Sequence, residues 1–190
     1  WVRERLTEAL INLAGNKLTP FAVAYLTDES EIIRRYGIDL LVKLSDPDSI
    51  GALVRAASED EDWWVKERAI EALGKLKDKR AVPYILDIMS KSKECVLVSI
   101  TALTSIGDVS ASSKLSALIP EGDKDVKLEV VRALKVLEAV DEAPALVEML
   151  KADEMPIQAH LEAKQLLAQW RLRQQLDDDT GGLSRGMSVL

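Results

Sequence analysis

The chain has 190 residues, of which 47% are hydrophobic and 30% are charged, a composition typical of a folded globular protein rather than a disordered one. A formal net charge of −7 argues against a phosphate-binding surface, so we expect no nucleic-acid partner. The sequence holds no apolar run long enough to cross a bilayer, so we expect no membrane partner either. Because the single cysteine, Cys95, rules out a disulfide within the chain, a reducing, cytoplasmic compartment is favoured.

The first predicted element is a helix over residues 2–14. Since neither a short helix nor a capping residue precedes Val2, we interpret the start as a cut edge and the first repeat as truncated, with a further repeat or domain upstream. Eleven helices are predicted in all, and the alternating pattern of a strand is absent. The six longer helices cover residues 2–14, 31–44, 63–76, 93–106, 124–139 and 155–174, and five shorter ones lie between them.

Residues 62–89 show the helical pattern most clearly. Asp62 stands at the N-cap position, and apolar residues recur on one helix face from Val65 to Leu76. After a short break, Pro83 falls in a first turn, where proline is tolerated, and begins a second short apolar helix. The segment therefore predicts two helices packed back to back.

The same unit recurs along the whole chain. The positions equivalent to Val65, called anchors below, are separated by 31, 32, 30, 31 and 31 residues: Val2, Ile33, Val65, Cys95, Val126 and Ile157. Seven and eight residues past an anchor comes an Ala-Leu or Leu-Leu pair in every copy except the last, where Lys164-Gln165 stands. Several columns that agree across the copies identify a repeat protein.

Capping residues fall in the same register. Good N-cap residues precede four of the anchors by three positions: Ser30, Asp62, Ser92 and Asp123. Glycines near the ends of three long helices predict left-handed closing residues: Gly15, Gly74 and Gly107.

The two segments VRERLTEALINL and VKERAIEALGKLKDKRAVPYIL resemble HEAT repeats, and in particular the short HEAT-like repeats named from phycobilisome lyases. The resemblance implies an all-α fold, an α-α superhelix (solenoid) of about six stacked hairpins, right-handed and with the longer helices on the concave side. We assign residues 1–176 to this array.

The chain beyond the array differs in composition. The last helix is polar on more than one face, as a capping helix needs. Residues 177–190 are predicted to be a flexible C-terminal tail, because Asp177-Asp178-Asp179-Thr180-Gly181-Gly182 has the composition of a linker. Leu183, Met187, Val189 and Leu190 are apolar anchors through which this tail is predicted to dock on its own array or to mediate self-association.

The sequence shows no catalytic, cofactor-binding or metal-binding constellation. Cys95 occupies an anchor column and is interpreted as a core residue, and His160 as an exposed polar residue. Asp46-Pro47-Asp48-Ser49 lacks the remaining ligands of a calcium loop and is interpreted as a turn followed by a helix cap. We therefore expect a non-enzyme.

Positions two, three and six past each anchor are predicted to face away from the core, where a protein or peptide partner would bind. Together with an exposed tryptophan, they give the predicted partner-binding residues: Tyr36, Trp64, Glu67, Arg68, Glu71, Leu97, Leu128 and Arg132. The alternative is that Leu97, Val98 and Leu128 pack against neighbouring helices. Of the adjacent Trp63 and Trp64, one is expected to be packed and the other at least half exposed; alternatively, the pair fills the groove between two repeats.

A basic residue follows four of the anchors directly: Arg3, Arg34, Lys66 and Lys127. These residues resemble the basic ladder of HEAT repeats, which pairs with acidic residues of the adjacent copy.

The sequence favours a non-catalytic interaction scaffold or regulatory module. The alternative, allowed by the resemblance, is a subunit of a bilin (tetrapyrrole) chromophore lyase.

Overall fold

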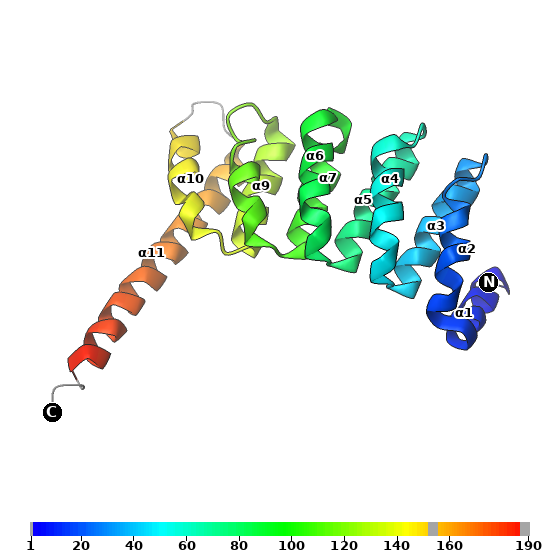
Figure 1. Ribbon diagram of the computed structural model, residues 1–190. Helices are drawn as coiled ribbons and strands as arrows, with labels where there is room; N and C mark the ends of the chain where they lie inside the picture. Colours follow the sequence, from blue (N-terminus) through cyan, green and yellow to red (C-terminus); the bar gives the residue numbers. More distant parts are fainter. Residues whose placement is uncertain (1, 152–155, 187–190) are drawn as a thin grey trace. The chain divides into compact units, whose positions relative to one another are not determined.

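A computed structural model describes residues 2–151 and 156–186, with side chains for residues 4–151 and 156–175. Within these ranges the chain is all-α, without a strand, and the helices occur in pairs (Figure 1). The α-helices are α1 (Val2–Ala14), α2 (Thr19–Tyr25), α3 (Glu31–Leu44), α4 (Ile50–Glu59), α5 (Trp63–Leu76), α6 (Val82–Lys91), α7 (Val96–Ile106), α8 (Ser112–Ser116), α9 (Lys124–Val136), α10 (Ala143–Leu150) and α11 (Ile157–Gly186). The predicted order of long and short helices is confirmed.

The chain divides into two compact units, residues 1–111 and residues 112–190. In the first unit, α2 packs on α3, α4 on α5 and α6 on α7, and the long helices α3, α5 and α7 pack in sequence on one another. In the second unit, α8 packs on α9 and α10 on α11, and α11 also contacts α9. Hairpins stacked through their longer helices are the predicted solenoid architecture.

Helix α5 shows why these segments fold as they do. Its N-cap Asp62 accepts a hydrogen bond from the backbone N–H of Val65, satisfying a donor that the first turn leaves free. Val65, Ala69 and Leu73 are buried on its inner face, and Lys77 closes the helix with a φ of 54°. Asp123 caps α9 in the same way, whereas the side chains of Ser30 and Ser92 accept no capping hydrogen bond.

Gly74 is not a helix-closing residue, and that interpretation is wrong. It lies inside α5, where a Cβ atom would stand 2.8 Å from the Cα of Ala102 in α7. Glycine is therefore required by the close approach of two helix backbones, and not by a left-handed conformation. Gly15 and Gly107, by contrast, do have positive φ.

The 3₁₀ turns before the short helices α4, α6 and α8 are organised by aspartates. Asp46, which is buried, accepts hydrogen bonds from the Thr19 hydroxyl at 2.6 Å and from the Asp48 N–H at 3.1 Å. These two bonds stabilise the carboxylate and hold the pKa of Asp46 below its ordinary value. Asp78 and Asp108 accept equivalent bonds from the N–H two residues later. The segment Asp46–Ser49 is therefore the turn that the sequence predicted.

Helix α1 carries the repeat pattern without burying it. Leu6 and Leu10 occupy the columns that are buried in α5, and Leu13 the column that is half-buried there, yet all three are exposed. Thr7 is the buried residue among the described side chains of α1. The reason is that α5 has α4 against this face, while none of the described residues forms a short helix against α1.

The last long helix is shifted relative to the predicted register. Ile157, the predicted anchor, is exposed, while Ala159, Ala163, Leu166 and Trp170 are buried at the spacing of a core face. The true anchor is therefore Ala159, and Leu166-Leu167 takes the place of the expected pair. Ala159 and Ala163, predicted to face away from the core, are part of it.

Helix α11 also continues further than predicted. It ends at Gly186 and not near residue 174, so residues 177–186 are helical in the structure despite the linker-like composition of residues 177–182. Three of the predicted anchors of the tail lie outside the described residues: Met187, Val189 and Leu190. Docking or self-association through residues 177–190 remains a prediction.

The two leucines Leu73 and Leu10 occupy the same column but have opposite environments, with 0% and 55% of their surface exposed. We expect Leu73→Ala to lower the free energy of unfolding by about 2–5 kcal/mol, because it removes buried methyl groups and leaves a cavity. Leu10→Ala should change it by about 0.5 kcal/mol or less. Urea denaturation followed by circular dichroism measures both, and equal losses would contradict the assigned burial.

Two fully buried serines differ in hydrogen bonding. The Ser49 hydroxyl donates to the Asp46 carbonyl at 2.6 Å, whereas the Ser99 hydroxyl has no partner within the described residues. Ser99→Ala should raise the free energy of unfolding, measured by urea denaturation, by about 1 kcal/mol, because an unpaired buried hydroxyl is costly. Ser49→Ala should lower stability by about 0.5–1.5 kcal/mol. A loss of stability in Ser99→Ala would show that its hydroxyl is paired.

Candidate partner-binding surface

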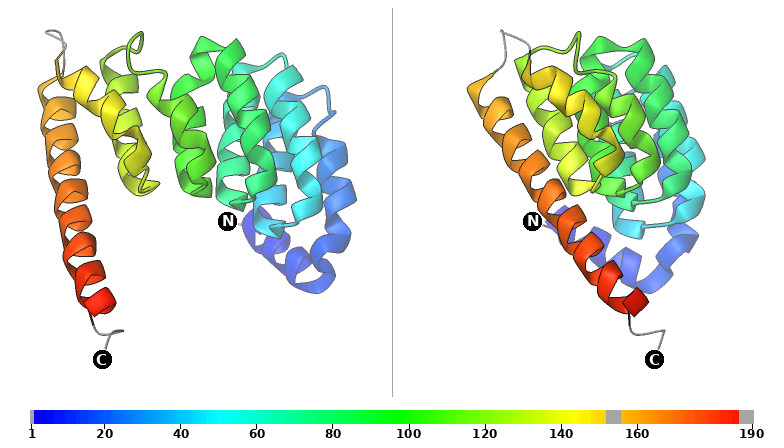
Figure 2. Two further views of the ribbon diagram at one scale, coloured as in Figure 1. Left: turned by 60° about the vertical axis from the view of Figure 1, so that its left-hand side comes forward. Right: turned by 90° about the vertical axis from the view of Figure 1, so that its left-hand side faces the viewer.

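The outward faces of α3, α5 and α7 form the candidate surface, and these three helices lie side by side in the first unit (Figure 2). Exposed apolar side chains lie at or near their N-terminal ends: Ile32 on α3, Trp63 and Trp64 on α5, and Leu97 on α7. Charged side chains follow on α3 and α5. We call these residues, together with Asp39, Arg68, Glu71 and Lys75, the long-helix surface.

Arg68 is the centre of the charged part. Its Nε donates to an oxygen of Asp39 on α3 at 2.8 Å, and its Nη1 donates to Glu71 at 3.0 Å. Lys75 lies 3.8 Å from the same Glu71 carboxylate. Burial alone would lower the pKa of Arg68, but the hydrogen bonds and charges of Asp39 and Glu71 outweigh it and raise the pKa. Arg68 therefore links two repeats and is already neutralised.

Tyr36, also predicted as a contact, is held by the first repeats. Its hydroxyl lies 2.6 Å from the Thr7 hydroxyl on α1, and its ring centroid lies 6.2 Å from that of Tyr25. Because Tyr36 is half-buried and hydrogen-bonded, its place is between α1 and α3 rather than free on the surface.

The two tryptophans depart from expectation. The exposed fractions of Trp63 and Trp64 are 51% and 53%, so neither is packed in the core. Their rings instead contact each other, with centroids 4.2 Å apart and planes 35° apart. The pair forms an exposed aromatic surface at the start of α5.

The two adjacent apolar residues Leu97 and Val98 on α7 differ in exposure. Leu97 is exposed, while Val98, which stands where α3 has Tyr36 and α5 has Arg68, is half-buried. Glu67 is half-buried beside Arg68 on α5. Leu97 thus fits the partner-surface interpretation, whereas Val98 fits the alternative in which it packs against a neighbour.

The remaining two predicted contacts belong to the second unit. Leu128 and Arg132 lie on α9, where Leu128 is half-buried. Arg132 donates to Glu162 on α11 at 3.2 Å and to Glu129 at 2.8 Å, and these hydrogen bonds raise its pKa. Each unit therefore has an arginine that bridges two long helices, and one surface running over both units remains a prediction.

The basic ladder has one well-formed pair among the described side chains. Arg34 donates from Nε and Nη2 to the two oxygens of Asp60, at 2.7 and 2.9 Å, and this hydrogen-bonded pair raises the pKa of Arg34. Lys66 makes no ion pair within 4.0 Å in the described part of the chain, because Ser92 replaces the aspartate at the equivalent position. The equivalent position for Lys127, residue 153, lies outside the described residues.

Catalytic groups do not converge on this surface. Cys95 is buried, as its column predicts, with its sulfur 3.4 Å from the Ser92 hydroxyl. His160 is half-buried, rather than exposed as predicted. Within the described residues, histidine, cysteine and carboxylate side chains form no group of three that suits a metal ion. A search of the described helices for one long and apolar enough to span a membrane found none.

Comparison with known proteins agrees with the helical-repeat architecture. Residues 19–98 match the family model of HEAT repeats. This part of the chain therefore carries HEAT repeats. A solved structure, the complex of CpcE and CpcF of phycocyanin lyase from Nostoc sp. PCC7120, superposes with a TM-score of 0.65 at 20% sequence identity over 80% of this chain. The match spans 64% of that structure's chain, and at this identity it shows the shared fold. A search of curated proteins found no match.

The two interhelical arginine pairs of the first unit should differ in strength. The side chains of Arg34 and Asp60 are 14% and 7% exposed, whereas those of Arg68 and Asp39 are 41% and 43% exposed. Double-mutant cycles with Arg→Ala and Asp→Asn should give a coupling free energy of about 1.5–3 kcal/mol for the first pair. Solvent screening should limit the second to about 0.2–1 kcal/mol. The reverse order would contradict the burial of Asp60.

Proposed function

We propose that this chain is a non-catalytic protein-interaction module that binds a protein or peptide on the long-helix surface. The observation that carries the proposal is the exposed pair Trp63–Trp64, with Ile32 and Leu97 exposed on the adjacent helices. Large aromatic side chains left in water are unfavourable in an isolated protein and are the residues that contribute most to binding at interfaces. Exposed apolar side chains on neighbouring helices indicate a binding patch.

The charged residues of the same surface favour a particular kind of partner. Asp39, Arg68, Glu71 and Lys75 are two acids and two bases that pair with one another, so they leave no net charge for long-range attraction. Such pairs act as a polar rim that sets the orientation of a partner. The partner should therefore present an apolar patch, and its binding should depend weakly on salt.

The proposal is tested by comparing the proteins that the immobilised chain captures from soluble extract of its source cells. Trp63→Ala/Trp64→Ala should abolish capture of at least one protein, and weaken its purified form about 30-fold or more, since losing an aromatic anchor costs about 2 kcal/mol or more. Tyr84→Ala removes an equally exposed aromatic ring from the short helix α6 and should leave capture unchanged. A captured set that is identical for wild type and the double variant contradicts the proposal.

A second candidate function is a subunit of a bilin chromophore lyase, which the similarity to the phycocyanin lyase complex supports. A lyase subunit of this kind must hold the tetrapyrrole or the subunit that holds it. Adding a free bilin to the chain should then shift and intensify the visible absorption band of the pigment. An unchanged spectrum, with the chain alone and with any partner it captures, leaves the interaction module as the better account.

A further inference from the structure

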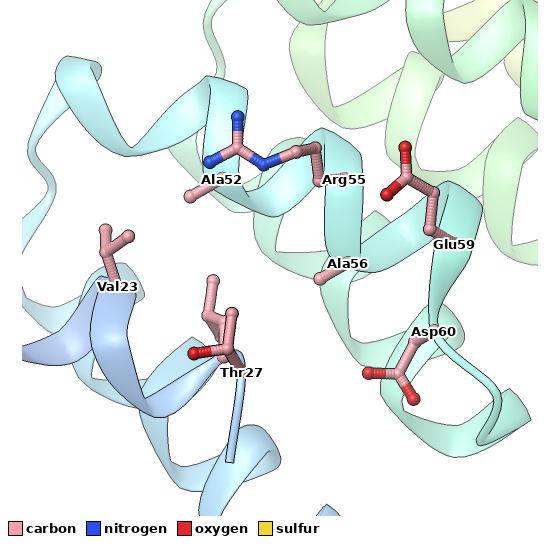
Figure 3. A pocket seen from close by; sticks show the side chains of 8 residues that line it. Val23, Thr27, Ala52, Arg55, Ala56, Glu59 and Asp60 are labelled. Carbon is pink, nitrogen blue, oxygen red and sulfur yellow. The ribbon is translucent and has the colours of Figure 1, made fainter.

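A groove lies between the short helices α2 and α4 of the first unit (Figure 3). Its volume is about 360 Å³, and its apolar lining comes from Val23 and Leu26 on one side and from Ala52 and Ala56 on the other. Arg55 and Glu59 stand along its rim on α4. We call it the short-helix groove. It lies on the short helices, whereas the long-helix surface lies on α3, α5 and α7.

The groove exists because α4 carries small side chains there. Helices α4 and α6 occupy equivalent positions in consecutive repeats, 32 residues apart, so Ala52 and Ala56 correspond to Tyr84 and Ile88. In α6 the position of Ala56 is filled by Ile88, which is buried. The pocket between α4 and α6 lies instead nearer the starts of these helices, beside Pro47, Gly51 and Tyr84. Alanine at both positions thus leaves the gap between α2 and α4 open.

Two of the charged side chains along the groove, Arg55 and Glu59, are also unpaired. In α6 the equivalent residues, Asp87 and Lys91, form an ion pair at 2.6 Å. In α4 the order is reversed, with Arg55 before Glu59, an orientation in which side chains four residues apart pair less well. Among the described side chains Arg55 and Glu59 form no ion pair, and both are exposed. A cation and an anion therefore remain free for a ligand on one edge of an apolar floor.

The other acid at the groove is not free. Asp60 is held by Arg34 through both carboxylate oxygens. Its charge is thus already neutralised, so Glu59 is the acid that can attract a basic group and Arg55 is the site for an acidic one. The apolar floor lies between α2 and α4. Thr27, in the turn after α2, also lines the groove, and its hydroxyl donates to the Ala24 carbonyl.

We propose that the short-helix groove is a second binding site, which takes a peptide segment of a partner protein by charge complementarity. An acidic side chain of the peptide pairs with Arg55, an apolar side chain packs on Ala52, Ala56 and Val23, and a basic side chain faces Glu59. The volume suits a few side chains rather than a folded domain. The site is independent of the long-helix surface and of its partner.

The probe is a random peptide library displayed on phage, selected against the full chain. Selection should enrich sequences in which an acidic residue neighbours an apolar one, with a basic residue further along. A synthetic peptide of the enriched sequence should lose measurable affinity for Ala52→Tyr/Ala56→Ile, which gives α4 the side chains of α6. Circular dichroism and the urea midpoint show whether this variant folds. Binding of a protein captured through Trp63 and Trp64 serves as an independent control that the rest of its surface is intact.

Charge exchange tests the assigned orientation. Arg55→Glu should weaken the peptide about tenfold at low salt and less at high salt, as expected for a rim charge. Replacing the peptide's acidic residue with lysine should restore binding to Arg55→Glu and weaken binding to the wild-type chain. The proposal is overturned if no peptide is enriched, if the filled variant binds as tightly as wild type, or if the charge exchange fails to restore affinity.

Discussion

The structure depends on the burial of one apolar column between consecutive hairpins. A single hairpin has a long and a short helix, and its long helix has apolar residues that one short helix cannot cover. Stacking the next hairpin buries them, as Leu73 and Leu103 show in α5 and α7. At Gly74 and Ala102 the fit is close enough that a side chain larger than hydrogen would strike the neighbouring backbone. The stability of each repeat therefore comes from its neighbours.

That constraint also bears on where the surface differs between copies. Because packing constrains the inner columns, two of the differences between copies lie on the outward faces of the long helices and in the gaps between short helices. The exposed tryptophan pair occupies the first location and the groove beside Arg55 the second. Both arise where one copy departs from its neighbours: tryptophan where α3 has Ile32, and alanine where α6 has Ile88. A repeat array thus turns a local substitution into a distinct surface without changing its core.

Polar contacts also join consecutive repeats, and they contribute less to stability than the buried apolar columns. Thr7 with Tyr36, Asp39 with Arg68 and Arg132 with Glu162 each join two consecutive long helices on their outward faces. The exposure of the two ion pairs limits what each contributes, so they act mainly in fixing how neighbouring helices are aligned. The Thr7–Tyr36 hydrogen bond joins a buried residue to a half-buried one. Arg34 with Asp60 is more buried and also ties the loop before α5 to α3.

The amino-acid sequence determined the helices and the repeat, since a core column must recur whenever a helix face is buried, and Val65, Ala69 and Leu73 do so. It also determined which turns aspartates organise, because a side chain that accepts a hydrogen bond two residues on needs no distant partner. Predictions from the sequence were wrong where a residue's environment depends on the neighbouring helix. The anchor of the last repeat is Ala159 and not Ile157, because the contacts of α11 with α9 and α10 decide which face of α11 is buried. Gly74 serves the packing of α5 on α7 rather than helix closure. Whether both tryptophans are exposed, whether Arg68 is already paired and whether Ala56 leaves a gap are decided by the adjacent helix. The spacing of residues within one helix does not give the distance to the adjacent helix, and only the tertiary structure supplies it.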